Sequence, residues 1–203
     1  MIKAITFDYG GVIKLSENDL IGDICNYLNV DRASFQEEYF KVNHLANVDN
    51  KSFSHIFVLV ASKFNDSEKT KKGVLNIIEK NKDKSHLNDE LIKIIKFLKN
   101  REYKIALLSN NSIDLKERLL KDKIIDLFDN IVISAEVGCQ KPQPEIFNIL
   151  FKELGLKPNE VVFIDDTPRS LEGADKIGYT PILFKDNKTF KKDLSNILKI
   201  ELI

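Results

Sequence analysis

Asp8 is the residue of this chain whose position most clearly indicates a chemical site. It follows the apolar run 2–7 and precedes the pair Gly10-Gly11, at which the backbone can turn sharply. Ligands of open α/β sheets bind where strands end. A carboxylate at such a position can act as a nucleophile or as a metal ligand. The segment therefore predicts a chemical site at the end of a first strand.

Three later apolar runs are also followed by polar groups that would suit one site. They are Ser109 and Asn110, then Lys141, then Asp165 and Asp166. The carboxyl ends of parallel strands lie along one edge of a sheet, so these groups are expected to converge with the first carboxylate. A nucleophile, a hydroxyl, an ammonium group and a pair of acids would then share one crevice.

The runs that would position these groups are short and bounded by polar turns, which favours strands over helices. The expected strands are 2–7, 104–108, 130–133 and 161–164, with a weaker fifth at 180–184. Apolar residues with helical spacing lie between them, as in 91–98 and 146–154. Strands that alternate with helices predict an α/β fold with a parallel, doubly wound sheet.

Residues 14–87 interrupt this alternation. Aromatic side chains at helical spacing recur there, which is typical of core packing rather than of a ligand site. These include Phe35, Phe40, Phe53, Phe57 and Phe64. We predict a four-helix cap over 14–87, inserted into a core domain made of 1–13 and 88–203, with the polar stretch 80–89 as a connector.

Composition excludes some classes of function. With 31 basic and 31 acidic side chains, the chain has no net charge that would attract nucleic acid. Cys25 and Cys139 are expected to be free thiols. The first residues lack signal-peptide features, and no run approaches the roughly 18 apolar residues of a membrane span. We expect a cytoplasmic protein without nucleic-acid or membrane partners, and its oligomeric state stays open.

Taken together, these segments resemble the haloacid dehalogenase (HAD) superfamily, in the branch with a helical cap after the first motif. The resemblance covers nearly the whole chain and rests on four motifs in order, each after an expected strand. The strings Lys141-Pro142-Gln143-Pro144-Glu145-Ile146-Phe147 and Phe163-Ile164-Asp165-Asp166-Thr167 are especially typical. It implies a Rossmann-like core and a Mg²⁺-dependent phosphatase acting on a small phosphorylated metabolite.

The resemblance also implies roles for the catalytic and phosphate-binding residues. Asp8 would attack phosphorus and form an aspartyl-phosphate, and Lys141 would neutralise Asp8 and the phosphoryl oxygens. Ser109 and the Asn110 main-chain N–H would bind phosphate oxygens. A helix beginning near Ser112 would add anion affinity through its dipole.

A metal site follows from the same resemblance. Mg²⁺ would bridge Asp8, the phosphate and Asp166, with several waters completing its shell. Asp165 would be a further ligand or would hold a metal-bound water. The Gly10 carbonyl would be another ligand, because the family uses the main chain there. Which of the two adjacent acids is the main ligand stays open.

Gly10 departs from the pattern of most phosphatases in this family. They carry at this position an aspartate that protonates the leaving oxygen and later activates water. General acid–base help of this kind is worth about 10²–10⁴-fold in rate. Three outcomes are open: a substrate with a good leaving group such as an anomeric sugar phosphate, replacement of the acid by water or a cap residue, or loss of catalysis. We favour the first.

Two alternative functions remain. One is a non-catalytic HAD-like binding or regulatory protein, which would not need the nucleophile that this chain retains. The other is a haloacid dehalogenase, although dehalogenases dispense with the acidic pair that is present here. The histidines His44, His55 and His86 are given no role, and Arg169 and Glu172 are interpreted as surface residues of a helix.

Overall fold

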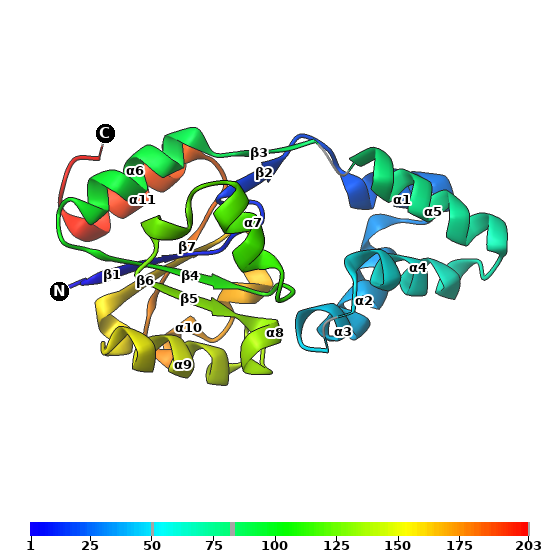
Figure 1. Ribbon diagram of the computed structural model, residues 1–203. Coiled ribbons are helices and arrows are strands. Elements are labelled where there is room, and N and C mark those ends of the chain that lie inside the picture. The colour runs from blue at the N-terminus through cyan, green and yellow to red at the C-terminus, as the bar shows by residue number, and fades with distance from the viewer. Residues whose placement is uncertain (50, 82–83, 203) are drawn as a thin grey trace.

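The computed structural model describes residues 1–49, 51–81 and 84–202 of the chain. Figure 1 shows a sheet flanked by helices and a separate group of helices, which are joined by a narrow two-stranded ribbon. Residues 50 and 82–83 of the expected cap, and residue 203 of the expected core, lie outside the described residues.

The central sheet has the strand order β5-β4-β1-β6-β7, and every neighbouring pair is parallel. Its strands are β1 (Ala4–Phe7), β4 (Lys104–Ser109), β5 (Asn130–Ile133), β6 (Val161–Asp165) and β7 (Thr180–Leu183). Phe7 lies opposite Leu107 on one side and Ile164 on the other. The carboxyl ends of β1, β4 and β6 are therefore level, and the predicted parallel α/β fold is confirmed.

Helices cover both faces of this sheet (Figure 1). One face carries α6 (Asp89–Lys99), α7 (Leu115–Lys121) and α11 (Asn187–Leu198), and the other carries α9 (Pro144–Leu154) and α10 (Ala174–Ile177). Strand alternation divides the core accordingly, because Ile5 and Phe7 pack on the first face and Ala4 on the second. Both faces are buried, as a parallel sheet requires.

Short elements fill the connections of the core. They are the 3₁₀ helices η1 (Ile125–Leu127), η2 (Pro158–Glu160) and η3 (Pro168–Leu171) and the four-residue α8 (Ser134–Val137). The longer α9 has Pro144 in its first turn, and Gly155 ends it in the left-handed conformation at φ 66°. This helix therefore begins and ends where its sequence indicates.

The inserted helices pack around a hydrophobic core of their own. They are α1 (Leu20–Leu28), α2 (Arg32–Val42), α3 (His44–Asn47), α4 (Phe53–Phe64) and α5 (Glu68–Asn81). Phe35 stacks on Phe57 and Phe64 at ring-centroid distances of 6.4 and 6.1 Å, as expected for core packing. Phe40 is an exception, since it lies outside this cluster among the described residues.

The ribbon that joins core and insertion pairs β2 (Lys14–Ser16) with β3 (Ser85–Leu87) in antiparallel register. The expected connector over 80–89 therefore contains the strand β3 at residues 85–87, which the sequence analysis does not predict. These strands are short and largely exposed, so they carry no apolar alternation that would reveal them. They pair because the insertion brings its two ends together.

Within the described ranges, no helix is long and apolar enough to cross a membrane. Cys25 is buried and Cys139 is partly exposed, and both are free thiols as predicted.

Candidate active site

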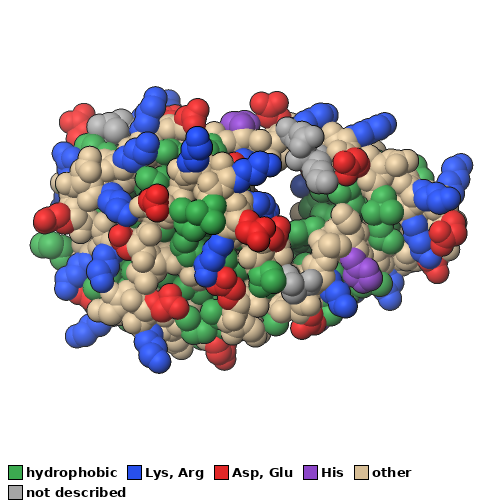
Figure 2. Space-filling view, viewed as in Figure 1, with side chains coloured by type: hydrophobic (Ala, Val, Ile, Leu, Met, Phe, Trp, Pro, Cys, Tyr) green, Lys and Arg blue, Asp and Glu red, His purple; other side chains and the backbone are tan. Residues whose placement is uncertain are grey.

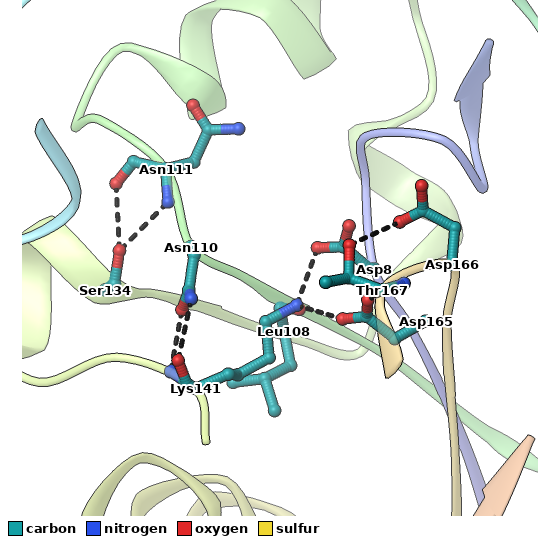
Figure 3. Close-up of polar contacts among 9 residues, drawn as sticks. All are labelled: Asp8, Leu108, Asn110, Asn111, Ser134, Lys141, Asp165, Asp166 and Thr167. Carbon is teal, nitrogen blue, oxygen red and sulfur yellow. Dashed lines mark hydrogen bonds and ion pairs between the residues drawn. The ribbon is translucent and has the colours of Figure 1, made fainter. Parts of the chain in front are cut away.

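Lys141 lies at the centre of the site and is almost fully buried, with 4% of the residue exposed. Its Nζ donates to Asp8 Oδ1 at 2.8 Å, Asp165 Oδ2 at 2.6 Å and the Leu108 carbonyl at 3.0 Å (Figure 3). Three acceptors satisfy the three N–H groups of an ammonium. Burial opposes this charge, but Asp8 and Asp165 outweigh it and hold the pKa of Lys141 above its usual value. The site therefore contains a buried cation.

The acidic pair at the end of β6 lies in two different environments. Asp165 is buried and accepts a hydrogen bond from the Thr167 N–H at 2.8 Å. Burial raises the pKa of Asp165 to about 6, with Asp8 adding to the rise and Lys141 opposing it. Asp166 is exposed at the rim and accepts a hydrogen bond from the Thr167 hydroxyl at 3.3 Å. Desolvation and the Asp8 carboxylate raise the pKa of Asp166 as well.

Asp8, Asp165 and Asp166 each offer a carboxylate oxygen, and these oxygens lie within 4.8 Å of one another. Three carboxylates around one ammonium leave an excess of negative charge, which a divalent cation would offset. Hard cations such as Mg²⁺ prefer carboxylate oxygens. The donor set therefore fits a magnesium ion.

Gly11 makes room for one of these acids. Its φ is +72°, and a Cβ at this position would lie 2.2 Å from Asp166 Oδ2. A side chain here would be strained and would also displace Asp166. Gly10 differs, because a Cβ there would have no neighbour within 4 Å among the described residues. The loop is thus tightly packed at Gly11 and open at Gly10.

The residues at the end of β4, Ser109 and Asn110, have distinct structural roles. Ser109 is buried at the end of the strand opposite Ile133, and its hydroxyl makes no hydrogen bond to the described acids. The Asn110 side chain accepts from the Lys141 N–H at 2.8 Å and donates to the Lys141 carbonyl at 3.0 Å. Asn110 thereby fixes the main chain that carries Lys141, which sequence reasoning did not foresee.

The sequence also did not predict two other contacts of the site. The Leu108 carbonyl that accepts from Lys141 has no signal, because only the assembled sheet points it there. Thr167 directly follows the acidic pair, and its small polar side chain was the available hint. The helix expected near Ser112 instead begins with α7 at Leu115.

The inserted helices face this edge of the sheet. Asn47 of α3 is buried, and its Nδ2 donates to Gln140 Oε1 of the core at 2.8 Å. Figure 2 shows an opening between the two parts of the molecule, with basic and acidic side chains around it. The acids and Lys141 therefore lie where the core faces the insertion.

Curated relatives cover only part of this chain. It is 27% identical over 135 residues to bifunctional epoxide hydrolase 2 of Sus scrofa, which is 64% of this chain and 24% of that protein. It is 32% identical over 84 residues to glyceraldehyde 3-phosphate phosphatase of Methanopyrus kandleri, 41% and 36% of the two chains. It is 31% identical over 86 residues to (S)-2-haloacid dehalogenase 4A of Burkholderia cepacia, and this match covers 42% of this chain and 37% of the relative. The chain thus spans about a quarter to a third of these relatives.

Solved structures match over nearly the full length. A HAD phosphatase from Thermococcus onnurineus superposes with a TM-score of 0.66 at 20% identity, over 100% of both chains. A HAD family enzyme from Bacteroides thetaiotaomicron, in complex with magnesium and inorganic phosphate, superposes with a TM-score of 0.62 at 21% identity, over 94% and 99%. These likenesses support the fold.

The family assignment comes from a family model described as haloacid dehalogenase-like hydrolase, which matches residues 2–178. This match spans the first strand, the insertion, the strand ends that carry the acids and the loop that carries Lys141. The chain belongs to the haloacid dehalogenase-like hydrolases.

Proposed function

We propose that this hydrolase is a cytoplasmic, Mg²⁺-dependent phosphatase that acts on a small phosphorylated metabolite through an aspartyl-phosphate. The observation that carries the proposal is the Lys141 ammonium, held 2.8 Å from Asp8 and 2.6 Å from Asp165 at the carboxyl edge of the sheet. This arrangement pairs a carboxylate nucleophile with a fixed positive charge. Phosphatase relatives support the reaction class.

In the proposed reaction, an Asp8 carboxylate oxygen attacks phosphorus, and the bond to the leaving oxygen breaks as the new bond forms. Water then attacks phosphorus, which releases inorganic phosphate and regenerates Asp8. Lys141 offsets the repulsion between carboxylate and phosphate. Because its Nζ also bonds Asp165 and the Leu108 carbonyl, it holds Asp8 in one orientation.

The same acids would hold the cofactor. Asp8, Asp165, Asp166 and the Gly10 carbonyl are the proposed ligands of Mg²⁺, and the clustering of the three carboxylates supports this set. When bound, the ion would supply positive charge that stabilises the transferring phosphoryl group.

Ser109 and the Asn110 main-chain N–H are proposed to bind phosphate oxygens. The Asn110 side chain already holds the backbone of Lys141, so the phosphate-binding and charge-bearing segments are tied together. The proposed partner is a small phosphorylated substrate rather than a nucleic acid or a membrane.

Gly10 restricts the proposed substrate. It cannot protonate a leaving oxygen, so substrates whose leaving oxygen is already stabilised are favoured, an anomeric sugar phosphate among them.

Purified protein with Mg²⁺ should hydrolyse para-nitrophenyl phosphate, whose leaving group needs no acid. Asp8→Asn should abolish turnover, whereas the matched variant Asp175→Asn, at an exposed position of α10, should retain it. Retained activity in Asp8→Asn would refute the assignment. Removal of the metal with a chelator should stop turnover reversibly.

Two comparisons separate the alternatives. Tight beryllofluoride binding in the presence of Mg²⁺ but no turnover of any phosphate ester would favour a binding protein. The dehalogenase relative makes halide release a necessary control. Metal-free release of chloride from 2-chloropropionate would favour that reaction instead.

A further inference from the structure

A small cavity lies between the core and the inserted helices, next to the candidate active site. Its volume is about 70 Å³. Its wall includes Phe40 and Asn43 of the insertion and Gln140, Lys141, Thr167 and Arg169 of the core. Lys141 connects this cavity to the candidate nucleophile, because it lines the cavity and its Nζ donates to Asp8 Oδ1 at 2.8 Å.

Arg169 is the unusual member of this wall. It follows Asp166 by three residues and lies in η3, with its guanidinium carbon 4.7 Å from the centroid of the Phe40 ring. Stacking on an aromatic ring holds the plane of a guanidinium but leaves the N–H groups at its edge available. Arg169 is an exposed residue of a 3₁₀ helix, in agreement with the expected surface position, and its guanidinium also lies over an aromatic ring of the insertion.

The charge of Arg169 has no acidic partner among the described residues. Arg32 and Arg118 each form an ion pair with an aspartate, whereas Arg169 forms none with any residue that the structure describes. Lys141 differs as well, because two acids already neutralise it. Among the described residues that line the cavity, none is acidic. The wall thus presents one uncompensated cation and neutral hydrogen-bonding groups.

A carboxylate matches this wall. Arginine binds carboxylates with two parallel N–H donors. The cavity is too small for a large second group, so it suits a carboxylate on a short carbon chain.

We propose that Arg169 is a specificity residue that binds a carboxylate of the substrate, so that the substrate is a small phosphorylated carboxylic acid. This rests on the proposed phosphatase function. Gly10 narrows the class further, to acids whose phosphate is on a stabilised leaving oxygen such as an enol oxygen.

The test compares two substrates that differ in this carboxylate alone, phosphoenolpyruvate and vinyl phosphate. Both have an enol leaving group, so the missing acid at Gly10 affects them alike. The wild-type protein with Mg²⁺ should prefer phosphoenolpyruvate in kcat/KM by about tenfold or more, as expected for a charge-assisted hydrogen bond. Arg169→Gln should remove most of this preference, mainly through KM.

Two variants control the result. Arg169→Lys keeps the charge but loses the paired donors, so it should retain part of the preference. Arg101 also stacks on a phenylalanine, 3.7 Å from the Phe97 centroid, but it lies before β4 at the opposite edge of the sheet. Arg101→Gln should keep the full preference.

Equal losses for both substrates in Arg169→Gln would overturn the proposal, because Arg169 would then only tie the insertion to the core. No wild-type preference for phosphoenolpyruvate would also overturn it. If vinyl phosphate or para-nitrophenyl phosphate is still hydrolysed through Asp8, the phosphatase function stands and only this inference fails. If no phosphate ester is hydrolysed, both fail.

Discussion

The core and the insertion, which face each other beside the candidate active site, are built differently. On the core side, Lys141 is buried and bonds three acceptors that come from three strand ends. On the side of the insertion, Phe40 is partly exposed and contacts Arg169 of the core, and Asn47 forms one neutral hydrogen bond with Gln140 of the core. Several hydrogen bonds therefore fix the geometry of the core side, whereas the named contacts of the insertion with the core are one aromatic contact and one neutral hydrogen bond.

This difference suits the proposed chemistry. Groups that attack and stabilise charge gain from a rigid, buried setting, because their orientation is set before the reaction begins. A cap that must open for substrate and close for chemistry needs contacts that break at low cost. The following changes would break or sharpen this contrast, beginning with the largest expected effect.

Lys141→Met should destabilise the protein most. It leaves Asp8 and the 1%-exposed Asp165 without their cation, and breaking a buried pair costs about 3–5 kcal/mol. The free energy of unfolding, measured by urea denaturation without metal, should fall by that amount. The control Lys116→Met breaks an exposed pair with Glu136 and should cost at most about 1 kcal/mol. Equal losses of unfolding free energy in the two variants would show that the buried cluster contributes no more to stability than an exposed ion pair.

Gly10→Asp should change selectivity rather than stability, since its Cβ meets no described atom within 4 Å. If the missing acid limits turnover, the new aspartate should raise kcat/KM for alkyl phosphates more than for aryl phosphates. The ratio of kcat/KM for para-nitrophenyl phosphate to that for ethyl phosphate should fall by about 10²-fold. Gly10→Asn has the same size but no acid, and should leave the ratio unchanged. A fall in both variants would contradict this account.

Gly11→Ala should weaken metal binding, because its Cβ would displace the Asp166 carboxylate. We expect the affinity for Mg²⁺, measured by calorimetry, to fall about tenfold or more. Gly155→Ala is the matched control, with φ +66° and open space around its Cβ. Both variants should lose roughly 1–2 kcal/mol of stability from the left-handed backbone. Unchanged metal affinity in Gly11→Ala would argue against Asp166 as a ligand.

Asn47→Ala should have the smallest effect. It removes the hydrogen bond between α3 and Gln140, worth about 1 kcal/mol. If the insertion closes over the bound substrate as proposed, the weaker contact should raise KM a few-fold in steady-state assays. Asn76→Ala, at an exposed position of α5, should leave KM as it is. If Asn47→Ala lowered the free energy of unfolding as much as Lys141→Met, the insertion would be held as firmly as the buried cluster of the core.

Local sequence determined the framework of the protein. The run 130–133 is the observed β5, and Pro144 and Gly155 mark the ends of α9, because strand alternation and helix ends depend on near neighbours. The parallel order of strand ends then brought Asp8, Lys141 and the acidic pair to one edge. The presence of a charged cluster could be foreseen for this reason.

Tertiary structure alone decided how those residues contact one another. Lys141 and Asp8 are 133 positions apart, and neither residue type specifies which oxygen its partner will meet. The approach of Asp166 to Gly11, the Asn110 clamp and the stacking of Arg169 on Phe40 depend in the same way on packing between distant segments. Periodicity sets which face a side chain occupies, whereas contacts of a few ångströms are set only when separate elements pack together.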